Sequence, residues 1–225
     1  MVQTAVTQVI QSLESVERDL AATRSTDSEF FLEWRTQLPT LKESEGPALD
    51  LIRDRFRYQR KAGSVAEGAV NAIVISPLLA LAGFYDSPFH LRSEASVSIK
   101  TTIEVEDEDE TGALQPETLR GRIDFLVLQD QFWQAVIESK ETTFDIEIGV
   151  PHILTYMMGA PSTQKCIFGM VTNGNHFMFI KLQRSPKPEY SFSNTFSLLS
   201  DLNQLCDVLQ ILNRIGTIAL QKGFS

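Results

Sequence analysis

The spacing of apolar and polar positions divides the chain into a helical first part and a second part in which strands and helices alternate. Apolar side chains recur near helical spacing in the first part, which predicts helices at residues 5–23, 25–38 and 48–61. Similar spacing further on predicts helices at residues 64–83, 143–159 and 200–222. Alternating or continuous apolar runs predict strands at residues 94–105, 122–128, 132–139, 165–172, 175–182 and 190–196. We therefore expect an α/β fold, with a mixed sheet flanked by helices in residues 63–225 and a helical extension in residues 1–62.

Three charged side chains lie in or just after the two adjacent strands at residues 122–128 and 132–139. Glu138 and Lys140 are two residues apart, so they share a strand face, about 6.5–7 Å from each other. Asp124 on the first strand can face them across about 5 Å if the register allows. Two carboxylates this close repel each other unless a cation lies between them. The alternative is an ordinary hairpin that ends in an ion pair.

A hard divalent ion is the cation that such a pair of carboxylates suits best. Mg²⁺ takes one or two protein carboxylates and completes its shell with water and substrate phosphates. The ammonium group of Lys140, beside that ion, could orient or deprotonate a water, or neutralise charge that develops on a phosphate. The pattern therefore indicates phosphoester chemistry.

Composition limits the classes of protein that remain. A length of 225 residues suits one large domain or one domain with an appendage, and no apolar run approaches the length of a membrane span. The absence of a secretory leader predicts an intracellular, cytoplasmic protein. Cys166 and Cys206 lie in apolar segments, where core packing is the expected role.

Charge argues against a broad electrostatic grip on nucleic acid, because the net charge is −9. Acidic residues gather at 104–110, which we interpret as a solvated loop. Basic residues gather at the end of the helix predicted for 48–61, around Phe56 and Tyr58. This cluster is either a solvated face with its aromatic side chains in the core or a ridge that contacts phosphates. A positive groove would need this cluster together with Arg120, Arg122 and Lys140.

Several of these segments resemble one nuclease family. Asp124, followed fourteen residues later by Glu138-Ser139-Lys140, resembles the D…ExK signature of the PD-(D/E)xK superfamily. Glu67, Ser76-Pro77-Leu78-Leu79 and Gly83-Phe84 resemble the helix that opens the nuclease domain of type I restriction enzyme R subunits, and Thr172-Asn173-Gly174 resembles a later segment of that domain. The resemblance covers residues 64–182 and implies a restriction-endonuclease-like fold.

The resemblance also implies roles for residues on two helices. In the family, an acidic residue at the position of Glu67 points into the metal site, whereas local spacing alone makes Glu67 the partner of Ser64 in a capping box. Tyr156 matches a tyrosine of the family, but His152 stands where the family often has glutamine, one helical turn before it. His152 either contacts a phosphate or is a surface or packing residue.

The leading hypothesis is a Mg²⁺-dependent nuclease that hydrolyses DNA phosphodiesters, with Mn²⁺ as a possible substitute. Asp124 and Glu138 would bind the metal, Glu67 would hold an outer ion or water, and Lys140 would position the attacking water. His152, Tyr156 and Arg122 would bind the substrate. The chain has no G-x-x-x-x-G-K-[ST] motif for a motor, so it would act alone, as a homodimer, or with a motor or specificity subunit. The alternative is a non-catalytic nuclease-fold subunit of a DNA-processing or defence complex.

Overall fold

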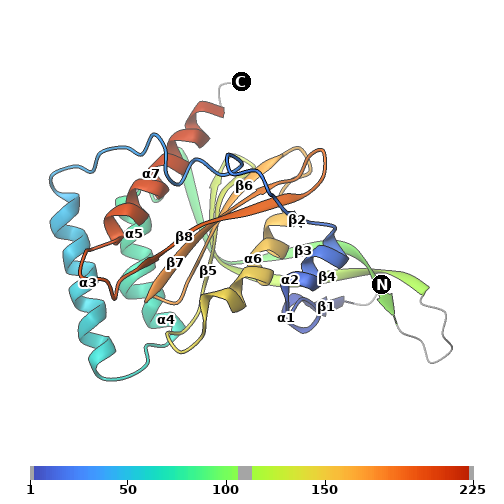
Figure 1. The fold of residues 1–225 in the computed structure, drawn as a ribbon, viewed down its shortest axis with the longest axis horizontal. Helices are drawn as coiled ribbons and strands as arrows, with labels where there is room; N and C mark the ends of the chain where they lie inside the picture. The colour runs from blue at the N-terminus through green and yellow to red at the C-terminus, as the bar shows by residue number, and fades with distance from the viewer. Residues whose placement is uncertain (1–2, 106–112, 223–225) are drawn as a thin grey trace.

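One mixed β-sheet forms the centre of the fold, and helices cover both of its faces (Figure 1). The computed structural model describes residues 3–105 and 113–222. The strands are β1 (Gln3–Ala5), β2 (Thr23–Arg24), β3 (Phe89–Val105), β4 (Ala113–Gln129), β5 (Phe132–Ser139), β6 (Cys166–Thr172), β7 (His176–Gln183) and β8 (Glu189–Ser197). The helices are α1 (Val6–Val9), α2 (Leu13–Leu20), α3 (Glu45–Lys61), α4 (Glu67–Val70), α5 (Ser76–Leu81), α6 (Gly149–Met158) and α7 (Leu205–Lys222). The expected α/β class is confirmed.

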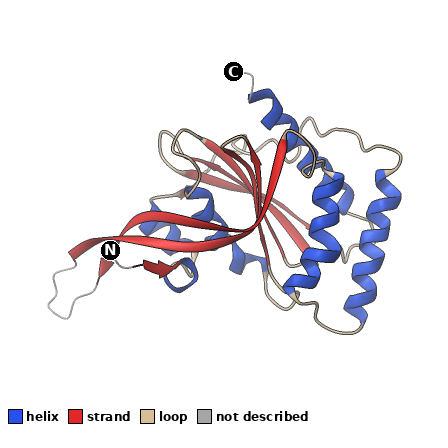
Figure 2. Ribbon diagram, turned by 180° about the vertical axis from the view of Figure 1, so that it is seen from behind, coloured by secondary structure: helices blue, strands red, loops and turns tan. Residues whose placement is uncertain are grey.

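The strands follow the order β1-β4-β5-β6-β7-β8-β2, and β3 pairs with β4. β3, β4 and β5 form an antiparallel meander, and the chain then passes through α6 to β6, which lies parallel to β5. β6, β7 and β8 are antiparallel, whereas the short strands β1 and β2 join β4 and β8 in parallel. The sheet is therefore mixed, as the restriction-endonuclease-like resemblance implies. The outer parts of β3 and β4 project beyond the rest of the sheet (Figure 2).

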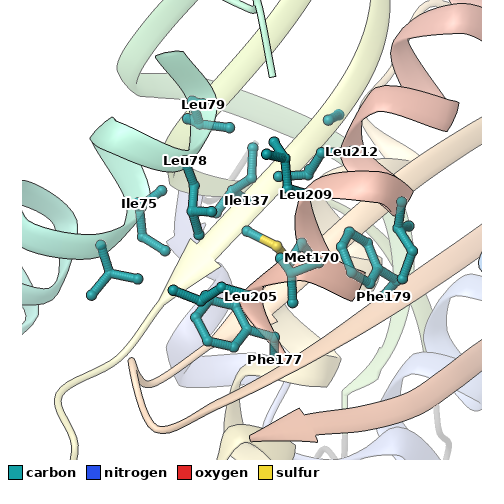
Figure 3. Close-up of a cluster of buried hydrophobic side chains, with 14 of the residues drawn as sticks. Ile75, Leu78, Leu79, Ile137, Met170, Phe177, Phe179, Leu205, Leu209 and Leu212 are labelled. Carbon is teal, nitrogen blue, oxygen red and sulfur yellow. The ribbon is translucent and has the colours of Figure 1, made fainter. Parts of the chain in front are cut away.

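Two hydrophobic cores lie on opposite faces of the sheet. One core packs α3, α5 and α7 against β5, β6 and β7, and Figure 3 shows Leu78 and Leu209 meeting Ile137 and Phe177 there. The other core packs α2 and α6 on the opposite face, and Ile153 and Leu154 are fully buried in it. None of the helices in the described part of the chain is both long and apolar enough to cross a membrane.

The first 44 residues are less helical than their apolar spacing predicts. The helix expected at residues 5–23 is split into α1 and α2, because the side chain of Ser12 accepts a hydrogen bond from the backbone of Ser15 and starts a new helix. The prediction of a helix at residues 25–38 is wrong, since this segment consists of turns and irregular structure. Phe31 packs against Phe168 in the core, with ring centroids 6.1 Å apart. Lys181 donates to the carbonyl of Phe30, so tertiary contacts override the local helical pattern.

Two residues of the basic cluster of α3, Arg57 and Arg60, connect the helix to other parts of the fold. Arg57 donates to the carbonyls of Leu198 and Ser200, and Arg60 donates to the side chain of Asn175 and to the carbonyl of Gly63. Phe56 is buried, as one of the two interpretations expected, but Tyr58 is 72% exposed. These contacts make a phosphate ridge on α3 the weaker of the two interpretations.

Two further expectations are corrected or fall outside the structure. The helix expected at residues 143–159 begins only at Gly149, after a 3₁₀ turn, η2 (Ile146–Ile148). Pro151 therefore lies in the first turn of α6, where its missing N–H costs little, and not in the middle of a helix. The acidic run 104–110 begins at the end of β3, and its remainder lies outside the described residues.

We expect Phe31→Ala to lower the free energy of unfolding by about 3–5 kcal/mol, because it empties a buried aromatic site. Tyr58→Ala, which truncates an exposed aromatic side chain on a regular helix, should change it by no more than about 0.5 kcal/mol. Urea denaturation of the two variants beside the parent measures both. Equal losses would mean that residues 25–44 do not pack as described.

Candidate active site

Asp124 and Glu138 lie side by side where β4 and β5 separate. The antiparallel register pairs Phe125 with Ile137, so the next position along each strand holds Asp124 and Glu138. Pairing between the two strands stops there, while β4 continues outward along β3. The register that the sequence left open is thus the one that brings the two carboxylates together.

Asp124 is held in place by the residue between the two other signature positions. One of its oxygens, Oδ2, accepts hydrogen bonds from the backbone N–H of Ser139 at 2.6 Å and from the Ser139 hydroxyl at 2.8 Å. Two donors on one carboxylate oxygen fix the rotamer of the side chain. This role of Ser139 has no signal in the sequence, since the middle position of ExK is variable in the pattern.

Glu138 and Lys140 form a buried ion pair. The Nζ of Lys140 lies 2.5 Å from Oε1 of Glu138, and Glu138 is only 3% exposed. The other oxygen, Oε2, is buried and has no hydrogen-bond partner within residues 3–105 and 113–222. Burial raises the pKa of Glu138 to about 8, against the opposing charge of Lys140. Burial alone would lower the pKa of Lys140, but the negative charges of Glu138, Asp124 and Glu67 outweigh it and raise this pKa.

The start of α6 closes over this ion pair. A Cβ atom on Gly149 would come within 2.6 Å of Val171 Cγ2 and would lie 3.7 Å from Cγ of Glu138. Only glycine therefore allows the first turn of α6 to approach β5 and β6 this closely. The first turn of α6 therefore packs against the buried Glu138 side chain.

Glu67 lies near the carboxylates and does not form the capping box that local spacing predicts. Helix α4 begins at Glu67 itself, its N-cap is Ala66, and no side chain caps it. Burial and the charge of Asp124 raise the pKa of Glu67, and Lys140 opposes them, so these groups share one electrostatic environment. A π-helical turn, η1 (Asn71–Ile75), follows α4 and leads into α5, which carries Pro77 in its first turn.

Tyr156 and His152 both contact the protein backbone beside the site. The phenol oxygen of Tyr156 accepts a hydrogen bond from the backbone of Arg122, and burial raises the pKa of this phenol. The His152 side chain hydrogen-bonds to the backbone carbonyl of Ile10, while its buried Nδ1 has no partner in the part of the chain that the structure describes. Burial and the charge of Lys140 lower the pKa of His152. Both residues therefore support the site's walls, and their substrate contacts stay a prediction.

Arg122 points toward solvent at the edge of the site. It forms a loose ion pair with Glu94 at 3.4 Å, and both side chains are about two-thirds exposed. Such an exposed pair contributes little to stability, so the guanidinium group can exchange its partner at small cost.

A pocket of about 400 Å³ contains most of these side chains. It is lined by Ala5, Val6, Thr7, Arg120, Gly121, Arg122, Asp124, Glu138, Lys140 and Tyr156. Glu67 and His152 are not among them. Nothing in the sequence indicates that Ala5, Val6 and Thr7 belong to this lining, because they reach the site only through the pairing of β1 with β4.

The two carboxylates fit a hard divalent ion that keeps much of its water. Within residues 3–105 and 113–222, no three or more His, Cys, Asp and Glu side chains are placed to hold a metal together. Glu67 therefore does not complete a three-carboxylate cluster with Asp124 and Glu138. Two carboxylates, one with an unpartnered buried oxygen, match the needs of Mg²⁺, which takes few protein ligands.

Comparison with known proteins assigns this chain neither a family nor an activity. No protein-family model and no curated protein matches the chain. Among solved structures, the chain is similar to a fragment of an HsdR subunit of a type I restriction enzyme from Vibrio vulnificus YJ016. The similarity has 17% sequence identity and a TM-score of 0.36, and it covers 60% of this chain and 24% of that one. A similarity of this size does not assign an activity.

We expect Gly121→Ala to destabilise the protein by about 1–3 kcal/mol, because its Cβ would collide with the buried ring of Tyr156. Gly46→Ala is the matched control, since a Cβ there meets nothing within 4 Å and lies in helix α3, where alanine stabilises by up to about 1 kcal/mol. Thermal unfolding of the two variants tests this. A neutral Gly121→Ala would show that Tyr156 does not lie against β4.

Proposed function

We propose that this protein is a divalent-metal-dependent nuclease that hydrolyses DNA phosphodiester bonds. The observation that carries the proposal is the placement of Asp124 and Glu138 side by side at the point where β4 and β5 separate, with Lys140 paired to Glu138. A purely structural ion pair would not need a second carboxylate beside it, nor would it leave Oε2 of Glu138 without a partner.

Mg²⁺ is the ion that the pair of carboxylates suits, and Mn²⁺ is a substitute of similar preference for oxygen ligands. Asp124 and Glu138 would hold it through the oxygens that Ser139 and Lys140 do not occupy. When bound, such an ion polarises a phosphoryl oxygen and lowers the pKa of a water. Glu67 would act from outside this pair, by holding a water or an outer ion.

Lys140 has the position to act on the attacking water. In the structure its ammonium group is the cation that compensates Glu138. Once another cation compensates that carboxylate, the ammonium group is free to donate hydrogen bonds to a water or to a phosphate oxygen in the same pocket. Arg122, loosely paired and exposed, is the side chain best placed to bind a neighbouring phosphate.

The competing proposal is a nuclease-fold subunit that binds partners and does not cut. The engagement of His152 with the backbone of Ile10 favours it, because this histidine is already occupied in the position where the family often has glutamine. The net charge of −9 also favours it. A motor or specificity subunit, or a second copy of the chain, would then deliver or bind the DNA.

We expect Asp124→Asn to reduce DNA cleavage by about a thousandfold or more, since an ion at this site supplies several kcal/mol of stabilisation to the transition state. Folding should be preserved, because an asparagine oxygen can still accept from Ser139. Asp130→Asn is the matched control, as it makes the same change in the exposed turn of the same hairpin, at a positive φ that asparagine tolerates. Cleavage of linear and circular DNA with Mg²⁺ or Mn²⁺, against EDTA, measures the effect.

Two outcomes would contradict the proposal in different ways. An Asp124→Asn variant as active as the parent would place the catalytic site elsewhere. A folded parent that cuts none of the DNA forms with either ion would favour the interaction subunit, and a search for its partner would follow.

A further inference from the structure

Two hydrogen bonds join the segment before Glu67 to the loop after Lys140. The backbone N–H of Val65 donates to the hydroxyl of Thr142 at 2.9 Å, and the backbone N–H of Thr142 donates to the carbonyl of Val65 at 3.1 Å. Val65 lies two residues before Glu67, and Thr142 lies two residues after Lys140. Both bonded residues are buried, so the loss of either bond would leave a buried polar group without a partner.

The loop side of this bridge is fixed by the turn between β6 and β7. The side chain of Asn173 donates to the carbonyl of Phe144 at 2.8 Å, and the side chain of Asn175 donates to the carbonyl of Thr142 at 3.3 Å. Both asparagines are themselves buried. Thr142 is therefore held by this turn, and its hydroxyl is a fixed acceptor for Val65.

Arg60 joins the same turn to the same segment. Its guanidinium group donates to the side chain of Asn175 at 3.2 Å and to the carbonyl of Gly63 at 2.6 Å. The segment that leads to α4 is thus held near its start by Arg60 and near its end by Thr142.

The position of Glu67 depends on how this segment is held. Within residues 3–105 and 113–222 its side chain is in no hydrogen bond or ion pair, and Asp124 and Lys140 act on it only as nearby charges. Helix α4 begins at Glu67 without a side-chain cap and has only four residues before the π-helical turn η1. The backbone on either side must therefore place the carboxylate, and Val65 is the bonded residue on the near side.

A shift of Val65 would move Glu67 relative to Lys140. Thr142→Val keeps the shape of the side chain but places a methyl group where the hydroxyl oxygen now lies, 2.9 Å from the Val65 nitrogen. Because non-bonded carbon atoms keep about 3.5–4.0 Å from their neighbours, the segment would move by roughly 0.5–1 Å. A misplacement of about 1 Å can cost about a hundredfold in rate.

We propose that Thr142 is a positioning residue of the candidate active site, which through Val65 holds Glu67 at the distance from Asp124 and Lys140 at which it acts on the metal ion or its water. This inference deepens the proposed nuclease function and rests on it. Thr142 does not line the pocket, so it influences the reaction only through Glu67.

The test is a double-mutant cycle in the full chain between Thr142→Val and Glu67→Gln. Cleavage of linear DNA in Mg²⁺ gives kcat and KM, and titration with Mn²⁺ alone, followed by electron paramagnetic resonance of the free ion, gives the metal affinity. Ser193→Ala is the matched control, because it also removes a buried hydroxyl that accepts from a backbone N–H at 2.9 Å, here that of Phe179, outside the pocket lining. Thr142→Ser keeps the acceptor and is the rescue variant.

We expect Thr142→Val and Glu67→Gln each to lower kcat and the affinity for Mn²⁺ by about tenfold or more, with KM for DNA nearly unchanged. The double variant should be no worse than Glu67→Gln alone, because the threonine acts through that carboxylate. Thr142→Ser and Ser193→Ala should cut and bind Mn²⁺ as the parent does, although urea denaturation should show Ser193→Ala to be destabilised about as much as Thr142→Val.

Three results would overturn the inference: a Thr142→Val variant that matches Ser193→Ala in kcat and Mn²⁺ affinity, a Glu67→Gln variant that matches the parent, or a double variant whose losses multiply. If Thr142→Val does not fold, Thr142→Ala, which leaves room for a water at the Val65 N–H, is judged by the same criteria. If the parent binds Mn²⁺ but cuts no DNA, shared losses of Mn²⁺ affinity would support the positioning role and refute the nuclease. A folded parent that neither cuts nor binds Mn²⁺ would refute both.

Discussion

The burial of Glu138 is the constraint on which the rest of the site depends. A carboxylate that is 3% exposed must be compensated, and Lys140 supplies the positive charge that does so. The neighbouring Asp124 opposes the charged form of Glu138, and two hydrogen bonds hold its Oδ2 to Ser139. Among the described residues, one oxygen of Glu138 still has no hydrogen-bond partner. Such incomplete satisfaction of a buried charge is costly, and functional sites are where proteins tolerate it.

The path of β4 explains why a pocket lies beside Asp124 and Glu138. β4 is long enough to pair first with β5 inside the body and then with β1 near its outer half, while β3 pairs along its other edge except at Asp124. Between β1 and β5, Tyr156 lies against Gly121 and Ser139 donates to Asp124. The side chains that line the pocket come from β1, α1, β4, β5 and α6, and from Lys140 just after β5.

Several residues near the pocket serve the fold as well as the site. Tyr156 lies against Gly121 and accepts a hydrogen bond from the backbone of Arg122, so it maintains the spacing between α6 and β4. His152 connects α6 to the N-terminal segment through Ile10. Roles of this kind depend on which backbone groups lie next to the side chain in the fold. The residue type alone does not distinguish such a structural role from substrate binding. Tyr156 and His152 of α6 therefore both contact segments that lie at the pocket, β4 and the N-terminal segment.

Local patterns in the sequence predicted strands at the places of β3 to β8 and the identity of the central residues, but not the short strands β1 and β2. Alternation and apolar runs placed β5, β6 and β7 to within a residue or two, and an acid inside an apolar strand marked Asp124 before any register was known. These features depend on neighbours two to four positions away, so they can be predicted from the sequence alone. The local pattern predicted the wrong structure where contacts with distant residues were stronger than the local helical preference. Residues 25–38 have helical spacing but are held in turns by the core and by Lys181.

Only the tertiary structure decided how these pieces meet. The register of β4 and β5 sets Asp124 beside Glu138, and the start of α4 at Glu67 rules out the capping role of that residue. Thr7 lies in the pocket with residues that are more than a hundred positions away in the chain. Each of these depends on strand pairing between distant segments, which is stabilised by the buried cores on the two faces of the sheet. The free energy of that burial comes from contacts across the whole fold, so it cannot be inferred from any short segment of the sequence.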